Sequence, residues 1–278
     1  MNTKILLALS TFACLIFMIA CNGGEMPEQT VQFPSIKDVP ATSWEKLAQK
    51  KIYFGHQSVG FNIIDGIKDV IRENPQIKLN IVETSNPADF TDPIFAHSRV
   101  GKNVDPKSKV QGIAEFLNNG IGDKADFAAL KFCYVDVTAN TVVKDVLKHY
   151  EDTMEQAEKE YPKTTIIHFT APLTRSKTTW KTTVKKLMGR QTWEYDDNIK
   201  RNEYNESLLK RFKGKEPVFD LAKIESTYPD GIRSSFTKDG KSYYSLVPEY
   251  TSDGGHLNEK GRKIVAEQLL IFLANLKK

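Results

Sequence analysis

Residues 126–135 read DFAALKFCYV, an almost continuously apolar run. A strand that is covered on both faces has this composition, because neither of its sides meets water. Four other short segments also have the composition of strands and are spread along the chain: 51–55, 78–83, 164–172 and 217–222.

Segments with helical periodicity alternate with these strands. The first carries apolar residues on one helical face, namely Ile63, Ile64, Ile67, Val70 and Ile71. Three later segments repeat the pattern, at 110–117, 141–160 and 258–276. Strands that alternate with helices predict a doubly wound parallel sheet of about five strands, with helices on both faces.

Two stretches depart from this alternation, 173–195 and 223–252, and both follow strands. In open α/β sheets ligands bind beyond the carboxyl ends of strands, so substrate contacts are expected there. The first stretch is rich in Lys and Arg and has no acid between Glu160 and Glu194. It is interpreted either as a face for an anionic glycan or phospholipid, or as a solvated surface insertion.

Composition excludes several classes of protein. The chain has 278 residues, of which 40% are hydrophobic and 27% charged, and this is typical of a globular protein rather than a disordered or collagenous one. Three cysteines are too few for a disulfide scaffold. The formal charge of +4 gives no argument for binding nucleic acid.

The N-terminus has the pattern of a bacterial lipoprotein signal. Residues 5–21 read ILLALSTFACLIFMIAC, follow Lys4 and are shorter than the roughly 20 residues that span a bilayer. The predicted organisation is a signal peptide (1–20), a tether that begins at lipidated Cys21 (21–43) and a hydrolase-sized domain (44–278). An uncleaved anchor helix and an ordinary signal peptide are the alternatives. The predicted location is the cell envelope, with the domain lipid-anchored and facing the periplasm or the exterior.

The candidate chemistry lies near the two ends of the domain. Ser58 follows the first strand at the start of a predicted helix, a position that presents a hydroxyl at the edge of the sheet. Asp253 and His256 stand three apart around two glycines, just before the last helix, which Asn258 is expected to cap. A nucleophilic serine needs a base and an orienting acid, and these two residues can supply both. Asp220 is an alternative acid, although a packing or capping role suits it better.

These residues resemble those of the SGNH/GDSL hydrolases, over roughly residues 50–275. The most specific likeness is DGGHLNEKGRKIVAEQL, residues 253–269, which resembles the closing block of that family. The resemblance implies a flavodoxin-like three-layer fold and an esterase that needs no cofactor or metal. It also implies that Ser58 is the nucleophile, His256 the base and Asp253 its partner. The amides of Ser58 and Gly101 would then receive the oxyanion.

Two departures from the family pattern affect the predicted chemistry. The family's Gly-Asp-Ser is replaced by His56-Gln57-Ser58, so the usual aspartate is missing. The family's Gly-x-Asn-Asp, whose Asn donates to the oxyanion, is replaced by residues 131–136, KFCYVD. Asn103 or Asn140 could take over as the donor. Losing one such donor costs about 10²–10³ in rate.

The remaining candidates have structural alternatives. His56 and Tyr243 are candidate substrate contacts, but His56 could instead pack beneath the turn and Tyr243 could belong to a hairpin after Asp239-Gly240. Ser58 taken alone could be only a helix cap. No His, Cys and Asp cluster has metal-ligand spacing. Cys133 is predicted to be a buried thiol.

The sequence therefore predicts a serine ester hydrolase of the cell envelope that removes acyl groups, above all acetyl, from a carbohydrate. A catalytically silent glycan-binding protein with the same fold and an O-acyltransferase are the alternatives. The expected partners are an acylated carbohydrate or small ester and, through the lipid, the membrane.

Overall fold

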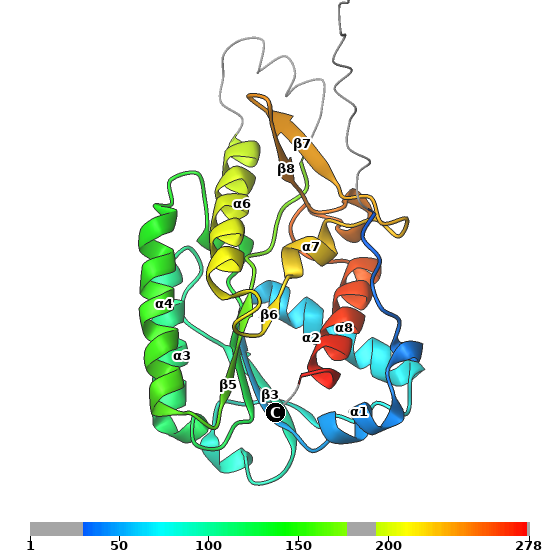
Figure 1. Ribbon diagram of the computed structural model, residues 1–278, viewed down its shortest axis with the longest axis vertical. Helices are drawn as coiled ribbons and strands as arrows, with labels where there is room; N and C mark the ends of the chain where they lie inside the picture. The colour runs from blue at the N-terminus through cyan, green and yellow to red at the C-terminus, as the bar shows by residue number, and fades with distance from the viewer. Residues whose placement is uncertain (1–29, 177–192, 277–278) are drawn as a thin grey trace, which may run out of the picture.

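The computed structural model describes residues 30–176 and 193–276. Its main sheet has six strands, β1 Lys51–His56, β2 Ile81–Glu83, β3 Ile94–Arg99, β4 Phe127–Leu130, β5 Thr165–Phe169 and β6 Val218–Phe219. Their order is β2-β3-β1-β4-β5-β6, and all neighbouring pairs are parallel (Figure 1). Five neighbouring strands, β3-β1-β4-β5-β6, follow the flavodoxin-like order, and β2 adds one strand at the edge next to β3. The predicted parallel α/β sheet is confirmed.

The strand β3 is the one that the sequence interpretation missed, and it raises the count from five to six. It reads IFAHSR, so only three apolar residues precede polar ones. The polar side chains are satisfied inside the domain: His97 Nδ1 lies 3.1 Å from His56 Nε2, and Ser98 Oγ lies 2.7 Å from the Tyr53 hydroxyl. These long-range bonds are invisible in a local pattern.

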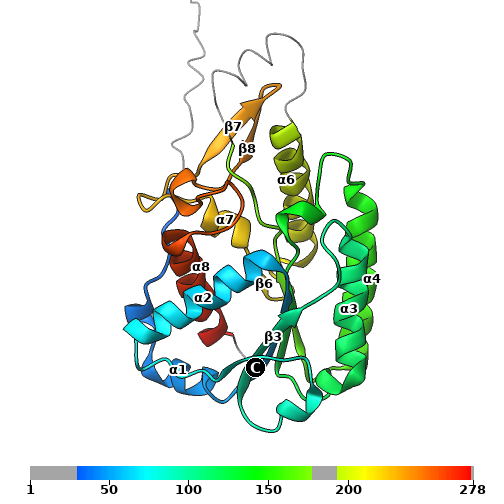
Figure 2. The ribbon, with the colours of Figure 1, turned by 180° about the vertical axis from the view of Figure 1, so that it is seen from behind.

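Helices cover both faces of the sheet (Figures 1 and 2). One face carries α1 Ala41–Leu47, α2 Ser58–Glu73, α7 Leu221–Glu225 and α8 Glu259–Ala274, and the other carries α3 Pro106–Phe116, α4 Val143–Glu160 and α6 Trp193–Phe212. Each face of the sheet has its own hydrophobic core, and alternate residues of β1 belong to one core or the other, because successive strand side chains point to opposite faces. Phe54 packs with the α2 and α8 side, and Tyr53 packs with the α3 and α4 side.

The helices α2 and α8 are joined closely. A Cβ atom on Gly66 of α2 would lie 2.3 Å from the Arg262 carbonyl oxygen of α8, so only glycine allows this approach. Asp69 of α2 accepts a hydrogen bond of 2.9 Å from Arg262 Nε. The pair therefore holds the start of α2 and the loop before α8 in a fixed relation.

The domain begins earlier than the predicted boundary at residue 44. The Val31 amide donates to the Gly231 carbonyl (2.9 Å), Gln268 Nε2 donates to the Pro34 carbonyl (2.9 Å), and Ile36 is buried in the core. The lack of apolar periodicity over residues 21–43 predicts a tether, but isolated apolar side chains anchor the described part of this segment to the domain. Cys21 and the predicted signal peptide lie outside the described residues. Within the described part of the chain, no helix combines the length and the apolar character needed to cross a bilayer.

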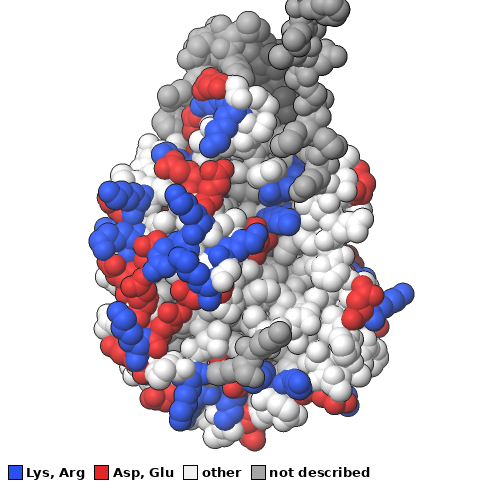
Figure 3. Space-filling model, in the orientation of Figure 1, with Lys and Arg blue, Asp and Glu red and all other residues white. Residues whose placement is uncertain are grey.

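Charged side chains of both signs are interspersed over α4 and α6 (Figure 3). Many of them are paired at the surface, such as Lys148 with Asp152, Lys200 with Glu203 and Arg211 with Glu155. This face therefore presents no patch of a single sign. Most of the basic stretch singled out in the sequence, residues 177–192, lies outside the described residues.

Candidate active site

Ser58 is the first residue of α2, directly after the carboxyl end of the central strand β1. The turn requires Gly60, because a Cβ atom there would lie 2.1 Å from the His56 ring. The Gly60 amide donates to the Gln57 carbonyl (2.8 Å), which closes the turn. The Ser58 hydroxyl is thus held, half-buried, at the positive end of a long helix.

Ser58, His256 and Asp253 form a continuous chain of hydrogen bonds. Ser58 Oγ lies 3.0 Å from His256 Nε2, and His256 Nδ1 lies 2.7 Å from Asp253 Oδ2. An ionised carboxylate can only accept, so Nδ1 carries the ring proton and Nε2 is free to accept the proton of Ser58. The structure therefore brings together the three residues for which the sequence predicts acid–base and nucleophilic roles.

The loop before α8 is built to hold Asp253 ionised. Its Oδ1 atom accepts hydrogen bonds from the Gly255 amide (2.9 Å) and the His256 amide (2.8 Å). Partial burial opposes ionisation, but these amides and the His256 ring hold the pKa of Asp253 well below its usual range. Asn62 of α2 accepts from the Leu257 amide (3.3 Å) and so fixes the loop against the helix that carries Ser58.

Tyr134 flanks the same loop from the β4 side. Its ring meets the His256 ring edge-on, with centroids 5.5 Å apart. A Cβ atom on Gly255 would lie 2.7 Å from the Tyr134 ring, so glycine lets the loop approach this closely. The second glycine of the Asp-x-x-His segment is therefore explained by packing.

Gly101 lies on a loop tied to the residue before Ser58. Gln57 Nε2 donates to the carbonyls of Val100 (3.1 Å) and Gly101 (2.8 Å). Gly101 has a φ of +58°, and a Cβ atom there would lie 2.5 Å from the Lys109 amide nitrogen. Gln57, at the position where the family has aspartate, thus fixes the Gly101 loop beside the turn. The predicted oxyanion role of Gly101 remains a prediction.

Asn103 is turned toward a different group. Its Oδ1 atom accepts a hydrogen bond from Lys109 Nζ (2.9 Å), and Lys109 is itself paired with Asp136. The Asn103 side chain therefore supports a buried ion pair. That it also donates to an oxyanion stays a prediction.

Cys133 is the residue that the sequence interpretation left out of the site. It was expected to be a buried thiol, and it is buried, but its Sγ atom lies 3.4 Å from Ser58 Oγ. Strand β4 ends earlier than predicted, at Leu130, and the chain then turns toward the start of α2. The available signal was topological: β4 pairs with β1, so residues after both strands meet at the same edge of the sheet.

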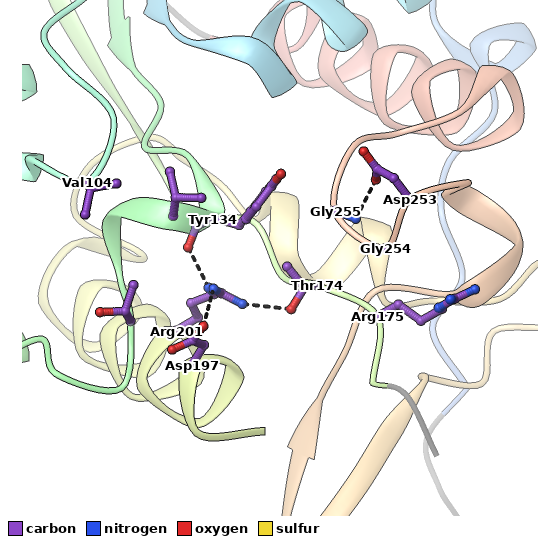
Figure 4. Close-up of a pocket in the computed structure, with 11 residues that line it drawn as sticks. Val104, Tyr134, Thr174, Arg175, Asp197, Arg201, Asp253, Gly254 and Gly255 are labelled. Carbon is purple, nitrogen blue, oxygen red and sulfur yellow. Dashed lines mark hydrogen bonds and ion pairs between the residues drawn. The ribbon is translucent and has the colours of Figure 1, made fainter. Parts of the chain in front are cut away.

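A pocket of about 430 Å³ adjoins the Asp253 side of this site. Residues from five regions of the chain line it (Figure 4). Its lining is mixed in character and comprises Val104, Tyr134, Val135, Thr138, Thr174, Arg175, Asp197, Arg201, Asp253, Gly254 and Gly255.

Arg201 forms the rigid wall of this pocket. Its Nε donates to the carbonyls of Tyr134 (2.8 Å) and Val137 (3.0 Å), and its Nη1 donates to Thr174 Oγ1 (2.8 Å). Burial lowers the pKa of Arg201 to about 10, so the group remains a cation at neutral pH. Arg201 therefore ties α6 to the end of β4 and to the segment after β5.

His56 is not a substrate contact, and the structure corrects that prediction. The residue is fully buried beneath Gly60, and its Nδ1 donates to the Gln57 carbonyl (2.8 Å). Burial lowers the pKa of His56 to about 3, so its Nε2 accepts from His97 as a neutral ring. The alternative, packing beneath the turn, is confirmed.

Tyr243 belongs to the hairpin of β7 Ser235–Lys238 and β8 Lys241–Tyr244. Its turn residues Asp239 and Gly240 both have positive φ, as expected for a two-residue hairpin turn. The Tyr243 ring stacks on Phe236, with centroids 5.7 Å apart. The pocket beside Asp253 is not lined by Tyr243, so the hairpin alternative fits its surroundings.

One group of side chains in the described residues has donors close enough to hold a metal ion, Glu158, His168 and Glu216. Both ring nitrogens of its histidine have hydrogen-bond partners. His168 Nδ1 lies 2.9 Å from the Tyr150 hydroxyl, and its Nε2 lies 2.6 Å from Glu216 Oε2. Burial and the neighbouring Glu216 raise the pKa of Glu158 to about 7, so the two carboxyl groups can share a proton.

The sequence matches no protein-family model. It also matches no curated protein. Solved structures that resemble the chain include an acetyl esterase (14% identity, 81% of this chain and 96% of that chain, TM-score 0.41). A second is the periplasmic domain of a lipopolysaccharide acetyltransferase from Salmonella ser. Paratyphi A (11%, 86% and 88%, 0.42). A third is a family 3 carbohydrate esterase from Clostridium thermocellum (14%, 81% and 99%, 0.40). Their identities are low and their TM-scores are below 0.5, so they assign no activity to this chain.

Proposed function

We propose that the protein is a serine ester hydrolase. The observation that supports this is the hydrogen-bonded chain from Ser58 Oγ through both ring nitrogens of His256 to Asp253. This arrangement places a base on the nucleophile and an ionised acid behind the base, which is what acyl transfer through serine requires. A helix cap alone would not need a histidine at 3.0 Å from its hydroxyl.

The reaction follows from these contacts. Ser58 Oγ attacks the acyl carbon while its proton moves to His256 Nε2, and the carbonyl oxygen becomes an oxyanion. The intermediate collapses when the leaving alcohol takes the proton from His256, which leaves an acyl-serine. Water then loses a proton to His256 and attacks the acyl-serine, which releases the acid and restores Ser58.

The proposed substrate is an O-acylated carbohydrate, with acetyl as the first acyl group to test. The pocket beside Asp253 supports a sugar on the alcohol side, because it combines an aromatic ring, Tyr134, with the hydroxyls of Thr138 and Thr174. Aromatic faces and hydroxyl groups are suited to a ligand that is polar at its edges and apolar on its ring faces.

The proposed location is the cell envelope, with lipid on Cys21 and the domain facing the periplasm or the exterior. Its support is the apolar run that ends at a cysteine and is followed by a polar segment. In cells that process lipoproteins, Cys21→Ser is expected to move the protein from the membrane fraction to the soluble fraction. Unchanged fractionation would contradict the anchor.

The activity is tested with the full chain purified in detergent and with p-nitrophenyl acetate as the substrate. Ser58→Ala is expected to lower kcat by about 10⁴-fold or more, because it removes the nucleophile. Ser207→Ala, a serine that donates to a carbonyl on the surface of α6, is the matched control and should retain full activity.

Two results would separate the alternatives. Equal rates for the wild type and Ser58→Ala, together with binding of an acetylated oligosaccharide, would favour the silent glycan-binding protein. Loss of activity in Ser58→Ala combined with acyl products on an added sugar acceptor, rather than free acid, would favour an O-acyltransferase.

A further inference from the structure

The environment of Cys133 combines features that a merely space-filling thiol does not need. Its Sγ atom lies 3.4 Å from Ser58 Oγ and accepts a hydrogen bond from the Val59 amide at the start of α2. Its side chain is almost wholly buried. The thiol thus lies beside the hydroxyl and the helix terminus where negative charge would form during attack by Ser58.

The backbone around Cys133 is rigidly held. Its amide donates to Asp136 Oδ2 (2.6 Å), and the other oxygen of Asp136 accepts from the Val104 amide (3.0 Å). Asp136 is also paired with Lys109, and both side chains are fully buried. The thiol is therefore fixed in place before any substrate arrives.

Lys131, two residues earlier, is fully buried, and its Nζ atom has no hydrogen-bond partner among the described residues. Burial lowers the pKa of the Lys131 amine, and the neighbouring Cys133 opposes this shift. A polar group that is buried without a partner is costly, so a lysine retained at this position indicates that the site uses it. Its field favours negative charge at Cys133 and at any oxyanion that forms beside it.

We propose that Cys133 is a catalytic residue whose S–H group donates to the oxyanion on the acylated Ser58, and that Lys131 is a positioning residue that supplies positive potential beneath it. This inference rests on the proposed hydrolase function. In the resting site the Ser58 proton is directed to His256 Nε2 and the Cys133 S–H is directed to Ser58 Oγ. When Ser58 Oγ bonds to the acyl carbon, the S–H turns to the new oxyanion and its proton stays on sulfur throughout.

The role requires a protonated thiol, and this sets a pH dependence. Burial raises the pKa of Cys133, but Lys131 and the hydrogen bonds that Ser58 and the Val59 amide would donate to the ionised thiolate outweigh it, so the net shift is downward. A thiolate would lose the donor and place negative charge beside the oxyanion, so kcat should fall as pH rises through this pKa. The groups that interact with Cys133 are Ser58 of α2, Lys109 of α3, Arg201 of α6, and Lys131, Tyr134 and Asp136 of its own segment. Glu225 of α7 acts on Lys131, and Asp253 and His256 of the loop before α8 lie beyond Ser58.

The experiment compares Cys133→Ala and Cys133→Ser in the full chain, with p-nitrophenyl acetate. Cys133→Ala is expected to lower kcat about tenfold with little change in KM, less than the loss of an amide donor because a thiol is a weak donor. Cys133→Ser retains a donor, so it should recover most of kcat and lack the alkaline decline. Thermal unfolding of both variants shows whether they fold.

A second measurement does not depend on activity. The ultraviolet absorbance of the thiolate, taken as the difference between the wild type and Cys133→Ser, reports ionisation of Cys133, and Lys131→Met should move its pH profile upward. Lys107→Met, which removes an exposed charge from α3, should leave the profile unchanged.

The outcomes are distinct. If the wild type is active and Cys133→Ala has the same kcat, the role of Cys133 is overturned and the hydrolase function stands. The same holds if Cys133→Ala and Cys133→Ser lose equal activity and both losses follow a loss of thermal stability. An unmoved thiolate absorbance profile in Lys131→Met would overturn the role of Lys131. A folded wild type without any esterase activity would instead overturn the proposed function itself.

Discussion

Two segments contact Ser58, and they are built differently. The loop of Asp253 and His256 is open to solvent, with side chains 57% and 38% exposed, and short-range hydrogen bonds within four residues shape it. Residues 131–136 are largely buried and depend on partners from distant helices. The exposed loop can thus be substituted with chemical consequences and little structural cost, whereas changes in the buried segment should damage the fold as well.

The largest expected effect belongs to the exposed loop. Asp253→Asn keeps Oδ1 for the two loop amides but replaces Oδ2 by an NH₂ group that cannot accept from His256 Nδ1. We expect kcat for p-nitrophenyl acetate to fall by about 10²–10³, somewhat less than in a fully buried triad because water reaches this carboxylate. The melting temperature should fall only slightly, because Asn keeps the acceptor for both loop amides and the pair with His256 is open to solvent.

Ser252→Ala alters an exposed neighbour in the same loop and is the control for this prediction. If Asp253→Asn lost stability in parallel with activity, the loop would be structural rather than chemical. The two segments would then not differ in whether a substitution affects activity alone or stability as well.

The same contrast explains what the sequence could predict. Asp253, His256 and the cap at Asn258 were predicted correctly as neighbours because their contacts are local and their spacing determines them. The position of Cys133 depends on β4 lying next to β1 and on Asp136 meeting Lys109 from α3, and no short pattern encodes these contacts. The strand β3 was missed for the same reason, since its polar half is satisfied by β1.

The buried segment should show its effect in stability. Asp136 accepts from three donors, Lys109, the Cys133 amide and the Val104 amide, with two oxygens. Asp136→Asn leaves one acceptor oxygen and strands the charge of Lys109, so the free energy of unfolding should fall by about 3 kcal/mol. Urea denaturation followed by circular dichroism measures this.

Asp152→Asn is the matched control, because it breaks an exposed pair with Lys148 and should leave the free energy of unfolding nearly unchanged. If the two substitutions lowered the free energy of unfolding equally, the buried network around Cys133 would contribute no more to stability than an exposed ion pair.

The smallest expected effect separates the two segments by the sign of their pH dependence. The pKa of Asp253 is depressed, so its contribution to stability is present above the unfolded-state pKa and is lost as pH falls. Glu225 interacts with Lys131 and has the opposite sign, because burial raises its pKa to about 8. As pH rises from about 4 toward 8, the unfolded chain releases the Glu225 proton while the folded protein retains it, so stability falls.

Glu225→Gln preserves the oxygen that accepts from the Leu173 amide and removes the titration. The variant should therefore become more stable relative to the wild type as pH rises from 5 to 8, by at most about 1.4 kcal/mol for each unit of pH. Denaturation at both pH values measures the difference, with Glu249→Gln, an exposed carboxylate, as the control. If the difference in unfolding free energy between the two proteins does not change with pH, Glu225 is already ionised in the folded protein. Its charge would then pair with Lys131 and neutralise the positive potential proposed beneath Cys133.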